Sequence, residues 1–208
     1  PAPSGGTDRF RRRPRRKESP LNPAPDAGPS RTPTVTVLIP AFNAAPFLRD
    51  SIQSALDQTF GDLEVLVVDD GSEDATPRIA ESFGGRVRLV RKSHGGLAST
   101  RNAGLRASHG HYIVFLDADD LLEPQLVERA VRFLQHRPGL AFVFANLRFF
   151  HSEGPLSQPF IPPRLFGGEE SVLHDPLGQV LLAGFSIAPS GLCAGKQALV
   201  EAGFFDES

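Results

Sequence analysis

The chain has 208 residues, 40% of them apolar, so it can bury one good core and at most a small appendage. Its net charge of −2 conceals an uneven distribution, because residues 1–33 hold eight Arg or Lys against three acids, about +5, which leaves about −7 for the rest. This balance excludes a broad basic face for nucleic acid on the folded part. The single cysteine, Cys193, excludes an internal disulfide and a cysteine-based metal cluster.

The first 33 residues are rich in Pro, Arg, Gly and Ser and hold almost no large apolar side chains. Such a segment cannot offset the entropy of ordering, so we expect residues 1–33 to form a disordered basic tail. Its run Arg9–Lys17 could make peripheral contact with an anionic membrane, although a solvated tail is the more common outcome. Because the sequence shows no spanning segment and no signal peptide, we expect a cytoplasmic location, with the inner face of the membrane as the alternative.

From Thr34 on, short apolar runs alternate with segments of helical periodicity. The predicted strands are Val35–Ile39, Leu63–Val68, Val87–Val90, Tyr112–Leu116 and Ala141–Ala145. The predicted helices are Pro46–Thr59, a segment that starts after Asp74, Leu97–Ala107 and Pro124–Gln135. Strands that are apolar throughout and alternate with amphipathic helices indicate an α/β fold, with a mostly parallel sheet covered on both faces.

The sequence is less regular after Arg148. Proline and Gly167-Gly168 predict a loop, Ser171–Gly184 a helix, and Lys196–Ala202 a short helix that follows a strand or turn. The chain has no methionine and stops shortly after Phe205, which we interpret as the mark of a piece of a longer protein.

Polar residues follow the predicted strands at the edge where ligands bind in open α/β sheets. The group Asp117-Ala118-Asp119-Asp120 follows the fourth strand. Carboxylates so close together repel one another, and a divalent cation removes that penalty. Their hard oxygen ligands suit Mg²⁺ or Mn²⁺ held together with substrate phosphates. The simpler alternative is that these acids cap the next helix, as Asp120 in particular could.

Strand two ends in a second acidic group, Asp69-Asp70, followed by Ser72 and Asp74. Ser72 or Asp74 is expected to cap a helix, which leaves Asp69 or Asp70 to accept a hydrogen bond from a nucleobase or ribose. Phe42, after the first strand, could stack on that base, although a Phe in this place is more often part of the core. Asn43 is expected to cap the first helix.

The loop around Gly95-Gly96 opens the third helix, whose first N–H groups favour anions. It matches neither the dinucleotide-binding nor the P-loop pattern. Arg101 in this helix could contact a phosphate or form a salt bridge with a strand-end aspartate, and the two interpretations do not exclude each other.

Four segments together resemble family 2 glycosyltransferases with the GT-A fold. They are Val37–Asn43 (VLIPAFN), Val67–Asp74 (VVDDGSED), Ala98–Gly104 (ASTRNAG) and Phe115–Asp120 (FLDADD). The resemblance runs from about Thr34 to Ala145 and implies a donor-binding half over about 34–150 and an incomplete acceptor-side half over 151–208.

What the resemblance implies is metal-assisted transfer of a sugar, with inversion, from a nucleoside diphosphate-sugar, UDP-sugar being favoured, to a glycan, lipid or protein acceptor. Asp70 would bind the base in a pocket lined by Pro40 and Phe42, and Asp117 would face the ribose or the metal. Asp119 would ligate the metal, with Arg101 beside these groups. Residues assigned to substrate on the same basis are Asn43, Asp69 and Ala118.

The resemblance also implies that the catalytic base lies beyond Ser208, so neither Asp206 nor Glu207 is assigned as base. The alternative is a non-catalytic nucleotide-sugar-binding module, or an inactive fragment without its base. A nucleotidyltransferase ranks lower, because it would need a basic glycine-rich loop directly after the first strand, where Pro40–Asn43 lies.

Overall fold

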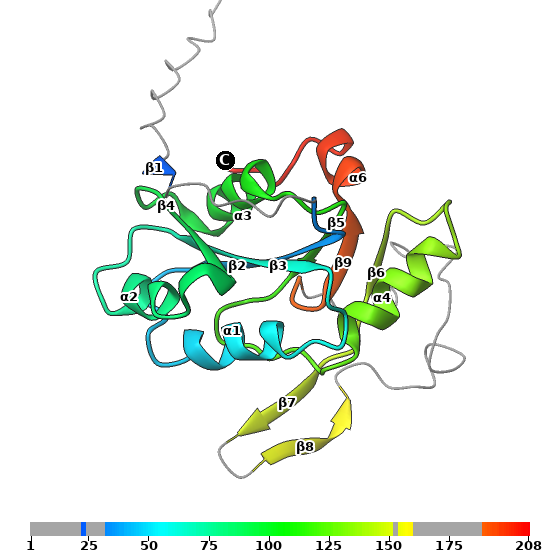
Figure 1. Cartoon of the computed structure of the whole chain (residues 1–208), viewed down its shortest axis with the longest axis horizontal. Coiled ribbons are helices and arrows are strands. Elements are labelled where there is room, and N and C mark those ends of the chain that lie inside the picture. The colour runs from blue at the N-terminus through cyan, green and yellow to red at the C-terminus, as the bar shows by residue number, and fades with distance from the viewer. Residues whose placement is uncertain (1–21, 24–31, 152–153, 160–188) are drawn as a thin grey trace, which may run out of the picture.

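The computed structural model describes residues 22–23, 32–151, 154–159 and 189–208, and shows an α/β molecule built on a central sheet (Figure 1). In this described part the sheet has seven strands, in the order β1-β4-β3-β2-β5-β9-β6. The four central strands are parallel, as predicted: β2 (Val35–Ala41), β3 (Leu63–Asp69), β4 (Val87–Arg91) and β5 (Tyr112–Phe115).

Three further strands complete the sheet. Strand β9 (Leu192–Gly195) runs antiparallel between β5 and β6 (Phe142–Phe144), and β1 (Asn22–Pro23) runs antiparallel to β4. The short β1 lies within the segment predicted to be disordered. The remainder of that segment up to residue 31, including the basic run, lies outside the described residues.

Helices cover both faces of the sheet (Figure 1). On one face pack α1 (Leu48–Leu56), α2 (Thr76–Glu81) and α4 (Leu126–Gln135). On the other pack α3 (Gly96–Ala107), α6 (Lys196–Glu201) and the segment that follows α6. None of the described helices is long and apolar enough to cross a bilayer.

The two cores follow from the alternation of side chains along each strand. Val37 and Ile39 of β2 belong to the core under α1 and α4, whereas Leu38 between them belongs to the core under α3. Because both faces are covered, both sets of side chains are apolar, which explains why the strands are continuous hydrophobic runs.

The loop predicted after Arg148 begins instead with a hairpin of β7 (Arg148–His151) and β8 (Gly154–Pro159). Proline led to the wrong prediction here, since it occurs in edge strands as well as in loops. The helix predicted at Ser171–Gly184 lies outside the described residues. A 3₁₀ turn over Gly84–Arg86, which the sequence did not suggest, precedes β4.

The helix caps predicted at Asn43 and Asp120 are wrong. Helix α1 starts after Phe47 and α4 after Gln125, and neither start has a side-chain cap. The backbone amides ahead of α1 are satisfied across loops instead, as Ala44 and Ala45 donate to the side chains of Thr76 (2.8 Å) and Asp74 (3.1 Å).

The α2 start is likewise without a capping bond from its N-cap residue, Ala75. Asp74, one position earlier, nevertheless accepts the amide of Thr76 at 2.9 Å. The predicted contribution of Asp74 to the start of this helix is therefore confirmed in part, while Ser72 is used elsewhere.

Gly110, just before β5, lies directly against the backbone of β2. A Cβ at this position would come within 2.3 Å of the Thr36 nitrogen and 2.5 Å of the Val35 carbonyl carbon. Displacing the backbone atoms of a central strand would disrupt its hydrogen bonds and packing, so the close approach requires glycine.

We therefore expect Gly110→Ala to destabilise the chain by about 1–3 kcal/mol through overpacking. Urea unfolding followed by circular dichroism measures this, with Gly61→Ala as the matched control, because a Cβ there meets nothing within 4 Å. Equal stability of the two variants would contradict the proposed close packing.

Candidate functional site

The four parallel strands end at one edge of the sheet, which we call the rim. It comprises residues 41–45 at the end of β2, 69–76 at the end of β3, 92–96 after β4 and 116–120 after β5. The strand ends are in register, because Ala41 lies opposite Asp69, which in turn lies opposite Arg91. The Asp70 amide donates to the Ala41 carbonyl at 2.8 Å. The fold therefore brings the motifs together at one edge of the sheet, as predicted.

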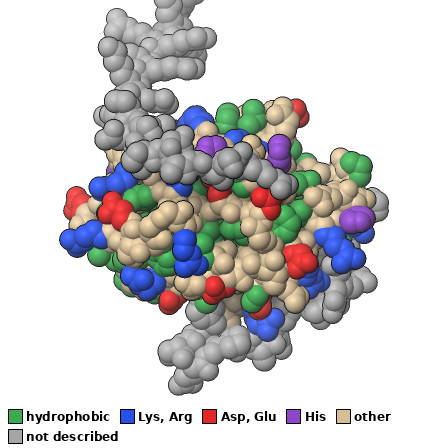
Figure 2. All heavy atoms as spheres, viewed as in Figure 1, with side chains coloured by type: hydrophobic (Ala, Val, Ile, Leu, Met, Phe, Trp, Pro, Cys, Tyr) green, Lys and Arg blue, Asp and Glu red, His purple; other side chains and the backbone are tan. Residues whose placement is uncertain are grey.

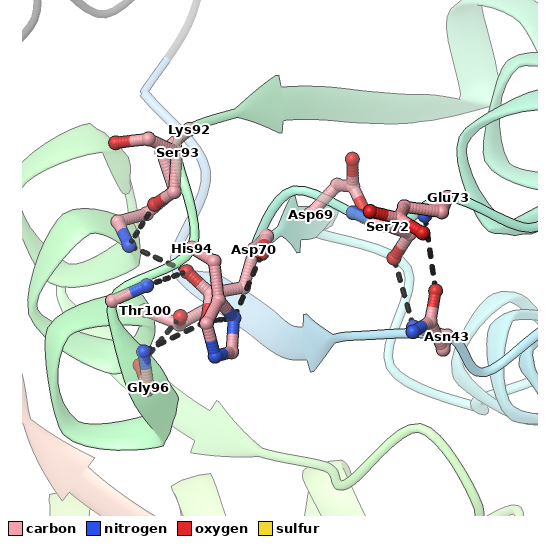
Figure 3. A network of polar contacts seen from close by, with 11 residues as sticks. Asn43, Asp69, Asp70, Ser72, Glu73, Lys92, Ser93, His94, Gly96 and Thr100 are labelled. Carbon is pink, nitrogen blue, oxygen red and sulfur yellow. Dashed lines mark hydrogen bonds and ion pairs between the residues drawn. The ribbon is translucent and has the colours of Figure 1, made fainter.

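The carboxylate of Asp70 lies at the centre of a polar network on this rim (Figure 3). Only 3% of the residue is exposed. Its oxygens accept the amides of Gly95 (3.0 Å) and Gly96 (2.9 Å) at the start of α3, and the Lys92 ammonium at 2.5 Å. A buried negative charge at the amino end of a helix, paired with a lysine, anchors α3 to the sheet.

The surroundings of Asp70 act on its pKa in opposite directions. Burial raises the pKa of this carboxyl, but hydrogen bonds from Lys92, the Gly96 amide and Thr100, together with the lysine charge, outweigh burial. The pKa of Asp70 therefore lies below its ordinary value of 3.8, and the group is an anion at neutral pH.

Asp69 points elsewhere and is fully buried. One of its oxygens accepts the Ser72 amide at 3.2 Å, and the other pairs with Arg91 Nε at 3.1 Å. In this structure Asp69 therefore closes the turn after β3, and its predicted contact with substrate stays a prediction.

The residues at the end of β2 and just after it differ in how exposed they are. Pro40 is buried within the strand, whereas Phe42 is 46% exposed. Asn43 has a left-handed backbone with φ of 48°. Its side-chain oxygen accepts the Glu73 amide at 3.0 Å and its own amide donates to Ser72 Oγ at 2.9 Å, so Asn43 joins two loops of the rim on the side away from His94 (Figure 3).

Arg101 forms the salt bridge that the sequence offered as one of two interpretations. Its guanidinium donates to Asp117 Oδ1 at 2.8 Å, and its side chain is only 8% exposed. Nε of Arg101 is buried and has no hydrogen-bond partner in the described part of the chain. The second interpretation, contact with a phosphate, stays a prediction.

The acidic turn after β5 directs one carboxylate outward. The Asp120 amide donates to the Asp117 carbonyl at 3.0 Å, and Ser51 Oγ donates to the Ala118 carbonyl at 2.8 Å and the Asp120 carbonyl at 2.7 Å. Ala118 places its methyl group in the core, Asp117 is half-buried, and Asp119 is exposed. The turn is thus fixed by its backbone while the Asp119 side chain remains free to reach a ligand.

The charges of this turn affect one another. Burial is the main reason that the pKa of Asp120 is raised, and the charges of Asp119 and Asp117 raise it further, against a hydrogen bond from Ser190. A cation bound here would relieve this repulsion, so the oxygen donors fit a hard ion such as Mg²⁺ or Mn²⁺. In the described residues no group of three His, Cys, Asp or Glu could hold a metal alone, so the phosphates of a ligand would have to supply further donors.

Helix α3 links the two acidic groups. The Gly96 amide at the start of this helix donates to Asp70 at 2.9 Å, and Arg101, in its second turn, pairs with Asp117 at 2.8 Å. Because both contacts are made by the first two turns of one helix, Asp70 and the turn of Asp117 lie within reach of one small ligand. The spatial arrangement on which the sequence-based hypothesis depends is therefore present.

Sequence reasoning missed two residues of the rim, Lys92 and His94, and one residue of α3, Asn102. For Lys92 the sequence does carry a usable signal, a lone cation at a strand end next to two acids. His94 lies in the glycine loop and has no signal of its own. Asn102, buried in α3, holds the segment after α6: its side chain both donates to the Phe205 carbonyl and accepts the Phe205 amide, each at 2.9 Å. No short motif predicts that last contact, which joins residues 103 positions apart in the sequence.

The charged side chains outside the rim form no continuous patch of one sign on the face seen in Figure 2, where acidic and basic groups are mixed. The rim is thus distinguished by its specific contacts and not by a broad electrostatic field of one sign.

A mostly parallel sheet with acidic motifs at its carboxyl edge is the arrangement expected of glycosyltransferases with the GT-A fold, and the comparisons agree. The model of "Glycosyl transferase family 2" matches residues 36–198. Hyaluronan synthase of Pasteurella multocida is 39% identical over 139 residues, which cover 65% of this chain and 14% of that protein. The chain therefore belongs to glycosyltransferase family 2.

Solved structures show the same fold. The structure of S. aureus TarS 1-349 superposes with a TM-score of 0.69 at 20% identity, covering 84% of this chain and 51% of that one. Mannosyltransferase PcManGT from Pyrobaculum calidifontis, in complex with GDP-Man and Mn²⁺, gives a TM-score of 0.59 at 27% identity, with 91% and 52% covered. The chain spans about half the length of these structures and a smaller share of the synthase.

The Asp70 network predicts a pH dependence of stability. A carboxyl whose pKa is lowered on folding stabilises the fold at pH values above its unfolded-state pKa, and this contribution is lost as pH falls through the lower folded pKa. We expect Asp70→Asn to cost about 1–3 kcal/mol at neutral pH, because charged hydrogen bonds are lost. The difference from the parent chain should shrink below about pH 4.

Urea unfolding of the parent and of Asp70→Asn between about pH 3 and pH 7 measures this effect. Glu81→Gln is the control, since Glu81 is exposed on α2. A difference that stays constant with pH would contradict the role of the ionised carboxylate.

Proposed function

We propose that the rim binds a nucleoside diphosphate-sugar, with UDP-sugar favoured, and that the sugar is transferred with inversion to an acceptor hydroxyl. The observation that carries the proposal is the α3 link, in which the Gly96 amide donates to Asp70 at 2.9 Å and Arg101 pairs with Asp117 at 2.8 Å. One ligand can thereby meet an acceptor for the base at one end and the acidic turn at the other. Membership of family 2 agrees with this assignment.

The base end of the site is assigned to Asp70 and Phe42. Asp70 is an anion at neutral pH and could accept a ring N–H of the base, while the exposed ring of Phe42 offers a stacking surface. Pro40, buried in β2, and Asn43, which joins the neighbouring loop by accepting the Glu73 amide, flank Phe42 in the chain and are assigned to the same end of the site.

The diphosphate end is assigned to Asp119, with Asp117 beside it. PcManGT, which is 27% identical, is known in complex with GDP-Man and Mn²⁺, and this supports a divalent ion here. When bound, Mg²⁺ or Mn²⁺ would neutralise the charge of the leaving diphosphate. Arg101 fixes one oxygen of Asp117, so Asp119 is the more available ligand of the two.

Inversion requires a base that takes the proton of the attacking hydroxyl. We assign this role to no residue in the described part of the chain: Asp206 and Glu207 are exposed, and the side chain of Glu207 accepts from Asn102 at 2.6 Å. The similarity to hyaluronan synthase supports a glycan acceptor and a role in polysaccharide synthesis.

The metal assignment predicts that Asp119→Ala removes the dependence of nucleotide affinity on Mn²⁺. The parent chain should bind UDP more tightly with Mn²⁺ than with EDTA, by about tenfold or more, because two charges of the diphosphate are neutralised. Isothermal titration with UDP, in the presence and absence of Mn²⁺, measures both affinities.

Asp50→Ala, at an exposed position of α1, is the matched control and should retain the metal effect. An unchanged metal effect in Asp119→Ala would refute its role as ligand. No binding of UDP, GDP or dTDP by the parent chain would count against the function as a whole.

A further inference from the structure

The side chain of His94 occupies an unusual place on the rim. It lies in the loop between β4 and α3, and 59% of it is exposed. Its ring stacks on Phe42, with centroids 4.2 Å apart and planes inclined by 30°. Its Nδ1 lies 3.0 Å from Asp70 Oδ2 and 3.3 Å from the Asp70 carbonyl oxygen, so the imidazole points into the polar network (Figure 3).

These distances favour one tautomer of the ring. Both atoms next to Nδ1 are acceptors, so the tautomer that fits is the one that carries a hydrogen on Nδ1 and donates it to Asp70. His94 therefore presents a flat aromatic face to Phe42 and a ring N–H to Asp70. These are the two contacts that the proposed function assigns to the nucleobase.

The ring of His94 and a nucleobase cannot occupy this position at the same time. Rings with centroids 4.2 Å apart already touch, which leaves no room for a third ring between them. A base that stacks on the covered face of Phe42 and donates to Asp70 must first move the imidazole away.

We propose that His94 is an internal occupant of the nucleobase subsite, displaced when the donor binds, and thereby a residue that sets donor affinity. This inference rests on the proposed function, because it takes the base to lie between Phe42 and Asp70. Asp70 keeps its bonds from Gly95, Gly96 and Lys92 when His94 leaves, so the rim stays assembled during the exchange. The exposure of His94 gives the ring solvent to move into.

The test is the affinity for UDP of the whole chain, measured by isothermal titration with Mn²⁺. His94→Ala should bind UDP about three- to tenfold more tightly than the parent, because the base no longer competes with a stacked, hydrogen-bonded ring. His94→Phe, which keeps a stacking ring but lacks the N–H, should gain less. His111→Ala is the matched control, as His111 is also exposed but lies at the opposite end of β5, and it should bind as the parent does.

The outcomes separate this inference from the proposed function. If the parent binds UDP and His94→Ala binds it equally or more weakly, with an unchanged melting temperature, His94 is no competitor and the inference fails while the function stands. If neither protein binds UDP, GDP or dTDP, both fail. Binding by His94→Ala alone would support both, as would a change in the ring resonances of His94 in the parent chain when UDP is added.

Discussion

The attachment of α3 to the carboxylate of Asp70 is the interaction on which the rim depends. Four parallel strands end at the same edge, but a helix must be held against them before their side chains can act together. Asp70 does this by accepting two amides at the start of α3 while Lys92 balances its charge. Gly96, with φ of 86°, permits the backbone to turn both amides toward one carboxylate.

From this anchor, the other parts of the rim follow in order. Once α3 is fixed at its start, Arg101 reaches Asp117 from the next turn, and Asn102 beside it holds the backbone of Phe205. The ring of Phe205 in turn lies edge-on to Phe115 of β5 and under the guanidinium of Arg101. The segment after α6 is therefore coupled to the acidic turn through one helix, so a shift of α3 would move both.

The central sheet could be predicted from the sequence because its strands are buried on both faces and therefore appear as unbroken apolar runs such as Val35–Ile39. The position of β9 could not be predicted, since it depends on pairing with two distant strands. Cap residues were assigned wrongly for a related reason. Asn43 has the right chemistry for a local cap, but its partner, the Glu73 amide, comes from another loop. The sequence indicates candidate site residues where a motif follows a strand. It does not indicate those whose contacts join residues far apart in the sequence, such as Asn102 and Phe205.

Aspartate residues have opposite roles at the two ends of the rim, and the surroundings of each carboxylate determine its role. Asp70 is buried, but its charge is met by amides, a lysine and a hydroxyl, which together lower the pKa of its carboxyl. The acidic turn has fewer compensating groups: Arg101 pairs with Asp117, while the charges of Asp117 and Asp119 raise the pKa of Asp120. A bound cation would therefore gain little electrostatic stabilisation from Asp70, whose charge is already paired, and much more from Asp119. The chain thus neutralises the first carboxylate with its own groups, whereas in the proposed function the second would be neutralised by an ion that arrives with a charged ligand.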